Sequence, residues 1–179
     1  MCEGGVGDAA EGDIVGGAGV DGDGAGVRWF DRGGGQHAVD VAAELGDGGT
    51  TTTATPVTVS GITTATAVSG GSNHTCALVS GSVRCWGLNG FGQLGNGTNN
   101  NSLVPVTVTG ITTATAIATG FNHACARLAD STLRCWGANF AGGLGNATFN
   151  DSNTPVTVSG ISTALGITAG GDTSCAVLS

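Results

Sequence analysis

The chain has 179 residues, with five arginines, no lysine and thirteen acidic residues, which give a formal net charge of −8. So few basic residues cannot supply the phosphate contacts that dominate nucleic-acid affinity, which excludes nucleic acid as an expected partner. No apolar run approaches the roughly 18 residues that a membrane-spanning helix needs, so we expect no membrane span.

The N-terminal segment 1–43 is rich in glycine and acidic residues. It cannot bury enough apolar surface to offset its ordering entropy, so we predict a disordered leader. Its stretch GGAGVDGDG resembles one calcium-binding β-roll nonapeptide. Asp23 stands where an apolar residue belongs, and such sites take ligands from successive turns, so one copy cannot build them. The abrupt change of composition near residue 44 also raises the hypothesis that this segment is an out-of-frame reading of an upstream repeat.

From residue 44 onward the sequence repeats with a period of about 50 residues. Two complete copies begin with PVTVSGITTATAVSG and PVTVTGITTATAIAT, and a third begins at Pro155 and reaches Ser179 halfway through the unit. We therefore predict propeller repeats over 44–179. The incomplete first and last units lead us to expect a fragment of a longer array. The expected units are 44–55, 56–104, 105–154 and 155–179.

Each complete unit is predicted to contain four short β-strands. Runs rich in Val, Ile and Thr and bounded by Gly, Asn or Ser indicate strands, and no apolar stripe of helical period interrupts them. In the first complete copy the expected strands are 56–60, 64–69, 74–79 and 82–87. Four strands recurring every 40–50 residues, roughly, are typical of a propeller blade. The predicted fold class is all-β, an incomplete β-propeller of four-stranded antiparallel blades.

The segment NHTCALVSGSVRCWG places two cysteines nine positions apart. If Ser80 and Gly81 form a two-residue turn, Cys76 lies directly opposite Cys85 on adjacent antiparallel strands. Opposed Cα atoms in such a pair are about 4.5–5.5 Å apart, which a disulfide tolerates. The spacing therefore predicts a disulfide across the hairpin.

The next copy has the same pattern with one residue more. Cys125 and Cys135 are ten positions apart, and a three-residue turn over 129–131 restores the opposition. Cys175 matches Cys125, but its disulfide partner would fall past the last residue, and Cys2 has no counterpart in any repeat. We therefore expect a second disulfide between Cys125 and Cys135, and none at Cys2 or Cys175.

Two other roles for these cysteines are conceivable. A zinc site built from His74, Cys76 and Cys85 would have three ligands, whereas structural zinc sites use four. A Cys–His nucleophile pair would need an exposed thiolate, yet both residues lie on a strand expected to pack against a neighbouring blade. A disulfide, or two buried thiols, fits better. The repeats contain few carboxylates, so few side chains could act as a general acid or base. We therefore expect no catalytic residue, metal or cofactor.

A histidine and a tryptophan recur once per complete unit. We predict structural roles for them, the histidines bonded to loop carbonyls and the tryptophans packed between blades rather than serving as partner anchors. These residues are His74, Trp86, His123 and Trp136. The Asn-rich connections can vary without harm to the sheets, so partner contacts are expected there. The candidate contact residues are Asn99, Asn100, Asn101, Phe149 and Asn150.

The segments HTCALVSGSVRCWGLNGFGQLGNGT and HACARLADSTLRCWGANFAGGLGNAT resemble the repeat of the regulator of chromosome condensation family. That repeat carries a His, a hairpin, a Trp-Gly-x-Asn turn and a Gly-Gln-Leu-Gly segment. The resemblance implies a propeller whose complete form has seven blades, and the paired cysteines are similar to bacterial members. Two positions depart from the pattern: Thr173 stands where the histidines do, and Gly143 replaces the glutamine found at Gln93.

The family includes a nuclear nucleotide-exchange factor, a plant light receptor and a bacterial β-lactamase inhibitor, so the resemblance implies a fold and not one function. We expect a non-enzymatic protein-binding scaffold, part of a larger secreted or surface propeller. The alternative is a nucleotide-exchange regulator of a small GTPase. Disulfides favour an extracellular or cell-surface location, although the sequence does not begin with a secretory signal. Open blade edges predict self-association.

Overall fold

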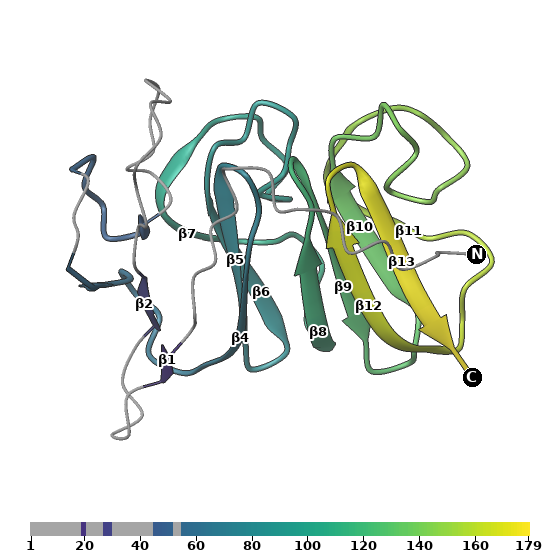
Figure 1. Cartoon of the computed structure of the whole chain (residues 1–179), viewed down its shortest axis with the longest axis horizontal. Coiled ribbons are helices and arrows are strands. Elements are labelled where there is room, and N and C mark those ends of the chain that lie inside the picture. The colour runs from purple at the N-terminus through teal and green to yellow at the C-terminus, as the bar shows by residue number, and fades with distance from the viewer. Residues whose placement is uncertain (1–18, 21–26, 30–44, 52–54) are drawn as a thin grey trace.

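The computed structural model describes residues 19–20, 27–29, 45–51 and 55–179 (Figure 1). Every element in these ranges is a β-strand, and none of the described residues forms a helix that could cross a membrane. The strands are β1 Gly19–Val20, β2 Val27–Trp29, β3 Val57–Thr58, β4 Ala65–Gly70, β5 His74–Val79, β6 Ser82–Gly87, β7 Ser102–Thr107, β8 Ala114–Thr119, β9 His123–Leu128, β10 Leu133–Gly137, β11 Ser152–Thr157, β12 Ala164–Gly170 and β13 Thr173–Leu178.

Most of the predicted leader, including Cys2, lies outside the described residues, so its disorder stays a prediction. The five described positions within it form β1 and β2, which pair with each other, and β2 also pairs with β3.

Two complete antiparallel blades and a third hairpin make up the rest of the chain. The sheet β4-β5-β6-β7 is the first blade, β8-β9-β10-β11 the second, and β12-β13 a two-stranded sheet. Figure 1 shows the first blade beside the second, with β12-β13 drawn over the second blade in this view. This arrangement confirms the predicted fold class, an all-β partial propeller. The predicted self-association through open blade edges stays a prediction.

The predicted grouping of strands into blades was wrong by one strand. We expected 56–60 to open its blade, but β3 pairs with β2, and the matching strand β7 closes the blade before it. The register Cys85↔Val106 joins β7 to the hairpin just completed. A repeating sequence fixes the period of an array but not its phase. The phase depends on the 88–101 connection, which returns the chain to β6 before it crosses to the next blade.

Both cysteine hairpins have the predicted turns. Ser80 and Gly81 have φ of 50° and 80°, as a type I′ turn requires, and Cys76 pairs with Cys85 as predicted. In the second hairpin the backbone N–H of Leu128 donates to the carbonyl of Thr132, and Ser131 has φ of 64°. The three-residue turn over 129–131 therefore absorbs the extra residue as expected.

The core lies between blades. Because successive residues of a strand face opposite sides, each sheet contributes one layer to each neighbouring interface. The interface of the first and second blades contains Cys76, Leu78, Val83, Cys85, Leu94, Val108, Ile111, Ala114, Ala124, Ala126 and Trp136. The other face of the first blade packs Ala77 and Trp86 against Leu45, Val59 and Ile62. Every blade is thus stabilised mainly by its neighbours, as expected for a repeat protein.

Candidate functional site

The four hairpin cysteines form the two predicted disulfides, Cys76–Cys85 and Cys125–Cys135, with Cα atoms 4.1 Å apart in each. Cys175 lies outside both bonds. The bonded sulfurs belong to residues that are at most 2% exposed and face the next blade. No group of His, Cys, Asp and Glu in the described ranges is arranged to hold a metal. These disulfides link strands within a hairpin and offer no thiolate for chemistry.

The two repeat tryptophans, Trp86 and Trp136, lie between blades and are fully buried. The Trp136 Nε1–H donates to the carbonyl of Gln93, 2.9 Å away, on the connection of the preceding blade. Gly95 has φ of 62°, and a Cβ there would lie 2.8 Å from the indole, so no larger residue fits. Gly46 stands against Trp86 in the same way. The Leu-Gly pair of one blade thus receives the tryptophan of the next.

The two histidines lie at the same position of successive blades but have different surroundings. His123 Nε2 is 2.8 Å from the Ser174 hydroxyl on the next sheet. His74 is fully buried, and neither ring nitrogen has a hydrogen-bond partner in the described part of the chain. Burial, with a smaller effect of nearby His123, lowers the pKa of His74 to about 3. The predicted bond to a loop carbonyl is therefore absent at His74.

Aligning the cysteines explains the difference. Ser174 precedes Cys175 in β13, and Ala124 precedes Cys125 in β9. By this equivalence we expect His74 to face the methyl group of Ala124 where His123 faces the hydroxyl of Ser174. A buried polar group left without a partner costs roughly 1–3 kcal/mol.

The variant Ala124→Ser is expected to raise the free energy of unfolding by about 1 kcal/mol, because it gives His74 the partner that His123 has. Ser174→Ala should lower it by a similar amount. Urea denaturation of both variants measures the two changes. If Ala124→Ser is destabilising while Ser174→Ala is neutral, the hydroxyl does not satisfy these imidazoles.

Two asparagines that the sequence reasoning did not single out hold the long connections in place. The buried Asn89 donates through Nδ2 to the carbonyls of Thr98 and Asn100, 2.9 and 3.0 Å away, and accepts from the backbone of Leu94. Asn139 makes the matching three bonds in the second blade. The available signal was the asparagine that recurs three residues after each tryptophan of a Cys-Trp pair. Hydrogen bonds of Asn89 and Asn139 therefore fix the shape of the connections 88–101 and 138–151.

We call the end of the blades that carries these connections the connection face. The chain runs toward the connection face in β4, β6, β8 and β10, and away from it in the strands between them. The turns 71–73, 120–122 and 171–172 consequently lie at the same end as the connections. The hairpin turns at Ser80–Gly81 and 129–131 lie at the opposite end.

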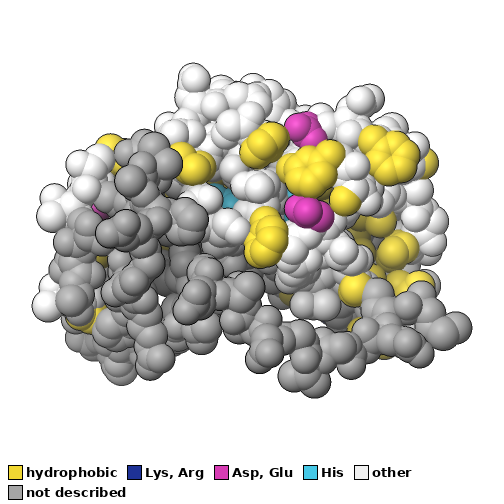
Figure 2. Space-filling model, turned by 45° about the horizontal axis from the view of Figure 1, so that its top comes forward, with side chains coloured by type: hydrophobic (Ala, Val, Ile, Leu, Met, Phe, Trp, Pro, Cys, Tyr) yellow, Lys and Arg dark blue, Asp and Glu magenta, His cyan; other side chains and the backbone are white. Residues whose placement is uncertain are grey.

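Four phenylalanines are exposed on the connection face, and they are all the phenylalanines within the described residues. Phe91, Phe121, Phe140 and Phe149 are 43%, 48%, 56% and 73% exposed. Figure 2 shows aromatic rings gathered on this face beside acidic side chains. The rings of Phe91 and Phe140, from successive blades, are in edge contact with centroids 6.4 Å apart. Single exposed apolar residues are common on protein surfaces, whereas apolar residues grouped on one face are typical of an interaction surface.

The predicted contact residues are only partly available. Asn101 Oδ1 accepts from the backbone of Asn89, and Asn99 binds Gly90 and Asn153. These side chains mainly hold the connection itself. Phe149 is 73% exposed, while Phe91, Phe121 and Phe140 were missed. The contact role of all of them stays a prediction.

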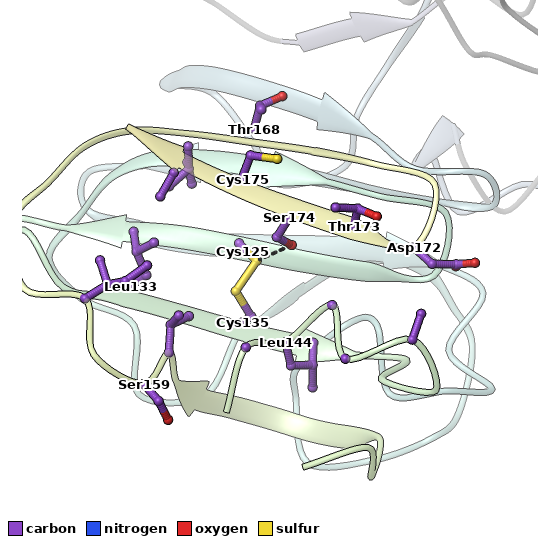
Figure 3. Close-up of a pocket in the computed structure, with 18 residues that line it drawn as sticks. Cys125, Leu133, Cys135, Leu144, Ser159, Thr168, Asp172, Thr173, Ser174 and Cys175 are labelled. Carbon is purple, nitrogen blue, oxygen red and sulfur yellow. Dashed lines mark hydrogen bonds between the residues drawn. A yellow bond between two sulfur atoms is a disulfide. The ribbon is translucent and has the colours of Figure 1, made fainter. Parts of the chain in front are cut away.

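A cavity of about 320 Å³ lies between the second blade and β12-β13 (Figure 3). Its walls include the Cys125–Cys135 disulfide, Leu144, Ile167 and Ser174. The equivalent positions between the two complete blades surround Trp136. Asp172 is the only carboxylate among its lining residues, so the cavity provides packing surface and lacks a paired acid and base.

Solved structures share the fold. The human WBSCR16 structure is 22% identical with a TM-score of 0.73, over 87% of this chain and 40% of that one. Prp20p from Saccharomyces cerevisiae, whose structure is described together with its binding to Gsp1p and histones, is 13% identical with a TM-score of 0.65. This match covers 82% of this chain and 40% of that one. A structure of Kap60 bound to yeast RCC1 (Prp20) is 25% identical with a TM-score of 0.56, over 65% and 28%. The chain thus spans well under half the length of these structures.

No curated protein matches the sequence. Models of the regulator of chromosome condensation (RCC1) repeat match residues 80–127 and 132–177, and a second model of the same repeat matches 65–93 and 114–142. The matched stretches contain both disulfide hairpins and the connections that follow them, and the first model alone matches more than half of the chain. The chain therefore belongs to the regulator of chromosome condensation repeat family.

Proposed function

We propose that the chain is a non-enzymatic protein-binding scaffold, part of a secreted or cell-surface propeller, that contacts its partner through the connection face. The observation that carries this proposal is the grouping of four exposed phenylalanines on one face. Aromatic residues are enriched in protein interfaces, where they supply large contact area at low entropy cost. The face is also preformed, since Asn89 and Asn139 hold its two long connections.

The disulfides support an oxidising compartment, because such bonds rarely persist in the cytosol. They weigh against the alternative function, nucleotide exchange on a small GTPase, which is intracellular. Prp20p is described with binding to Gsp1p and histones, but its likeness to this chain, at 13% identity, extends to the fold alone.

Selection from a random 12-residue peptide display library on the immobilised chain tests the proposal. We expect enriched peptides to lose binding to the double variant Phe140→Ser/Phe149→Ser and to keep it with Leu165→Ser. Leu165 is a matched control, since it is 58% exposed, against 56% for Phe140, and lies near the opposite end in β12. Enriched peptides that bind the double variant as well as the wild type would contradict the proposal.

A further inference from the structure

The basic residues of the two blades lie toward the end opposite the connection face. Arg84, Arg127 and Arg134 occupy strand positions nearer the hairpin turns, and Asp130 lies in one of those turns. Asp151 and Asp172 lie on the connection face, beside the phenylalanines. Figure 2 shows acidic side chains next to the aromatic rings and no Lys or Arg among the described residues in that view. The connection face is therefore aromatic and acidic.

The acidic groups have fixed positions. Asp151 is exposed, and its Oδ1 accepts a 2.7 Å hydrogen bond from the backbone N–H of Asn139, the residue that anchors the connection. This bond leaves the carboxylate charge on the connection face, two residues after Phe149 in sequence. Asp172 lies in the turn between β12 and β13 and is partly exposed.

We propose, on the basis of the proposed function, that the partner presents an arginine-bearing extended segment to this face. A guanidinium plane stacks on an aromatic ring and is attracted to its electron-rich face. The same group binds a carboxylate through two parallel donors, which the compact lysine ammonium cannot do. The surface of phenylalanines flanked by aspartates meets both requirements, and no Lys or Arg among the described residues competes there in the view of Figure 2. The complementary charge also raises the rate of encounter.

The test uses the full 179-residue chain and three labelled dodecapeptides that alternate glycine with arginine, lysine or glutamate. Binding is followed by fluorescence anisotropy at about 0.15 M salt, where charges more than about 8 Å apart are largely screened. We expect the arginine peptide to bind more tightly than the lysine peptide, and the glutamate peptide not to bind. The acidic N-terminal segment is common to all variants, so differences between variants report the connection face.

Phe140→Ser/Phe149→Ser is expected to weaken binding of the arginine peptide about tenfold, the effect of one or two cation–π contacts. Asp151→Asn, which keeps an oxygen for the Asn139 N–H, and Asp172→Asn should each weaken it several-fold. Leu165→Ser should have no effect. These are exposed side chains, so the thermal midpoint should be unchanged, which separates lost contacts from lost folding.

Arginine-peptide affinity that is equal in the wild type and the double phenylalanine variant would overturn this inference, as would equal binding of the glutamate peptide. If the peptides selected from the random library depend on the phenylalanines but lack arginine, the inference fails while the proposed function stands. If no selected peptide depends on the phenylalanines, the proposed function itself fails.

Discussion

Replacing Trp136 with alanine is expected to lower the free energy of unfolding by about 3–5 kcal/mol, the usual cost of removing a buried tryptophan. The indole is fully buried between the two complete blades and bonded to the Gln93 carbonyl. Its loss would open a void beside Leu94 and Val108. Urea denaturation followed by circular dichroism measures the change.

Trp136→Phe is the matched control. It removes the hydrogen bond but keeps most of the apolar contact, so we expect a smaller loss, about 1–2 kcal/mol. Equal stability of Trp136→Ala and the wild type would mean that the indole does not join the blades.

The double variant Cys76→Ala/Cys85→Ala should lose about 2–3 kcal/mol, because cross-linking a loop of this length restricts the unfolded chain. Both cysteines are fully buried, so the lost sulfur contacts add to this entropic effect. Denaturation of the variant and the wild type, each with and without reductant, measures it.

Reductant should destabilise the wild type more than the variant, which keeps only the Cys125–Cys135 bond. If reductant has the same effect on both proteins, the Cys76–Cys85 bond makes no contribution.

The local parts of this fold could be predicted from sequence alone. The hairpin turns, the cross-strand pairs and both disulfides depend on neighbours within about ten residues, where turn length fixes the register. A seemingly minor insertion, one residue between Cys125 and Cys135, was correctly assigned to the turn. The burial of the tryptophans also followed from their recurrence once per unit.

Features that depend on distant contacts could not be predicted. Which strand begins each blade depends on the pairing of β7 with β6 across the 88–101 connection. The repeat period does not determine that pairing. His74 and His123 look equivalent in sequence, yet their surroundings differ through Ala124 and Ser174, about 50 residues further on.

The sequence predicted only part of the connection face, because the rest of that face also depends on distant contacts. The sequence pointed to the Asn-rich connections, and Phe149 was among the predicted contacts. The grouping of Phe91, Phe121 and Phe140 around it depends on the folded shape of two connections and one turn. Asn89 and Asn139 determine that shape, and their role becomes visible only through their bonds.

The proposed function requires that both hairpins are oxidised, because disulfides rarely persist in the reducing cytosol. Peptide mapping of the protein isolated from its own cells, with thiols alkylated at lysis and no reductant, tests it most directly. We predict peptides linked as Cys76–Cys85 and Cys125–Cys135. Recovery of these four cysteines in alkylated form would contradict the account and favour an intracellular regulator.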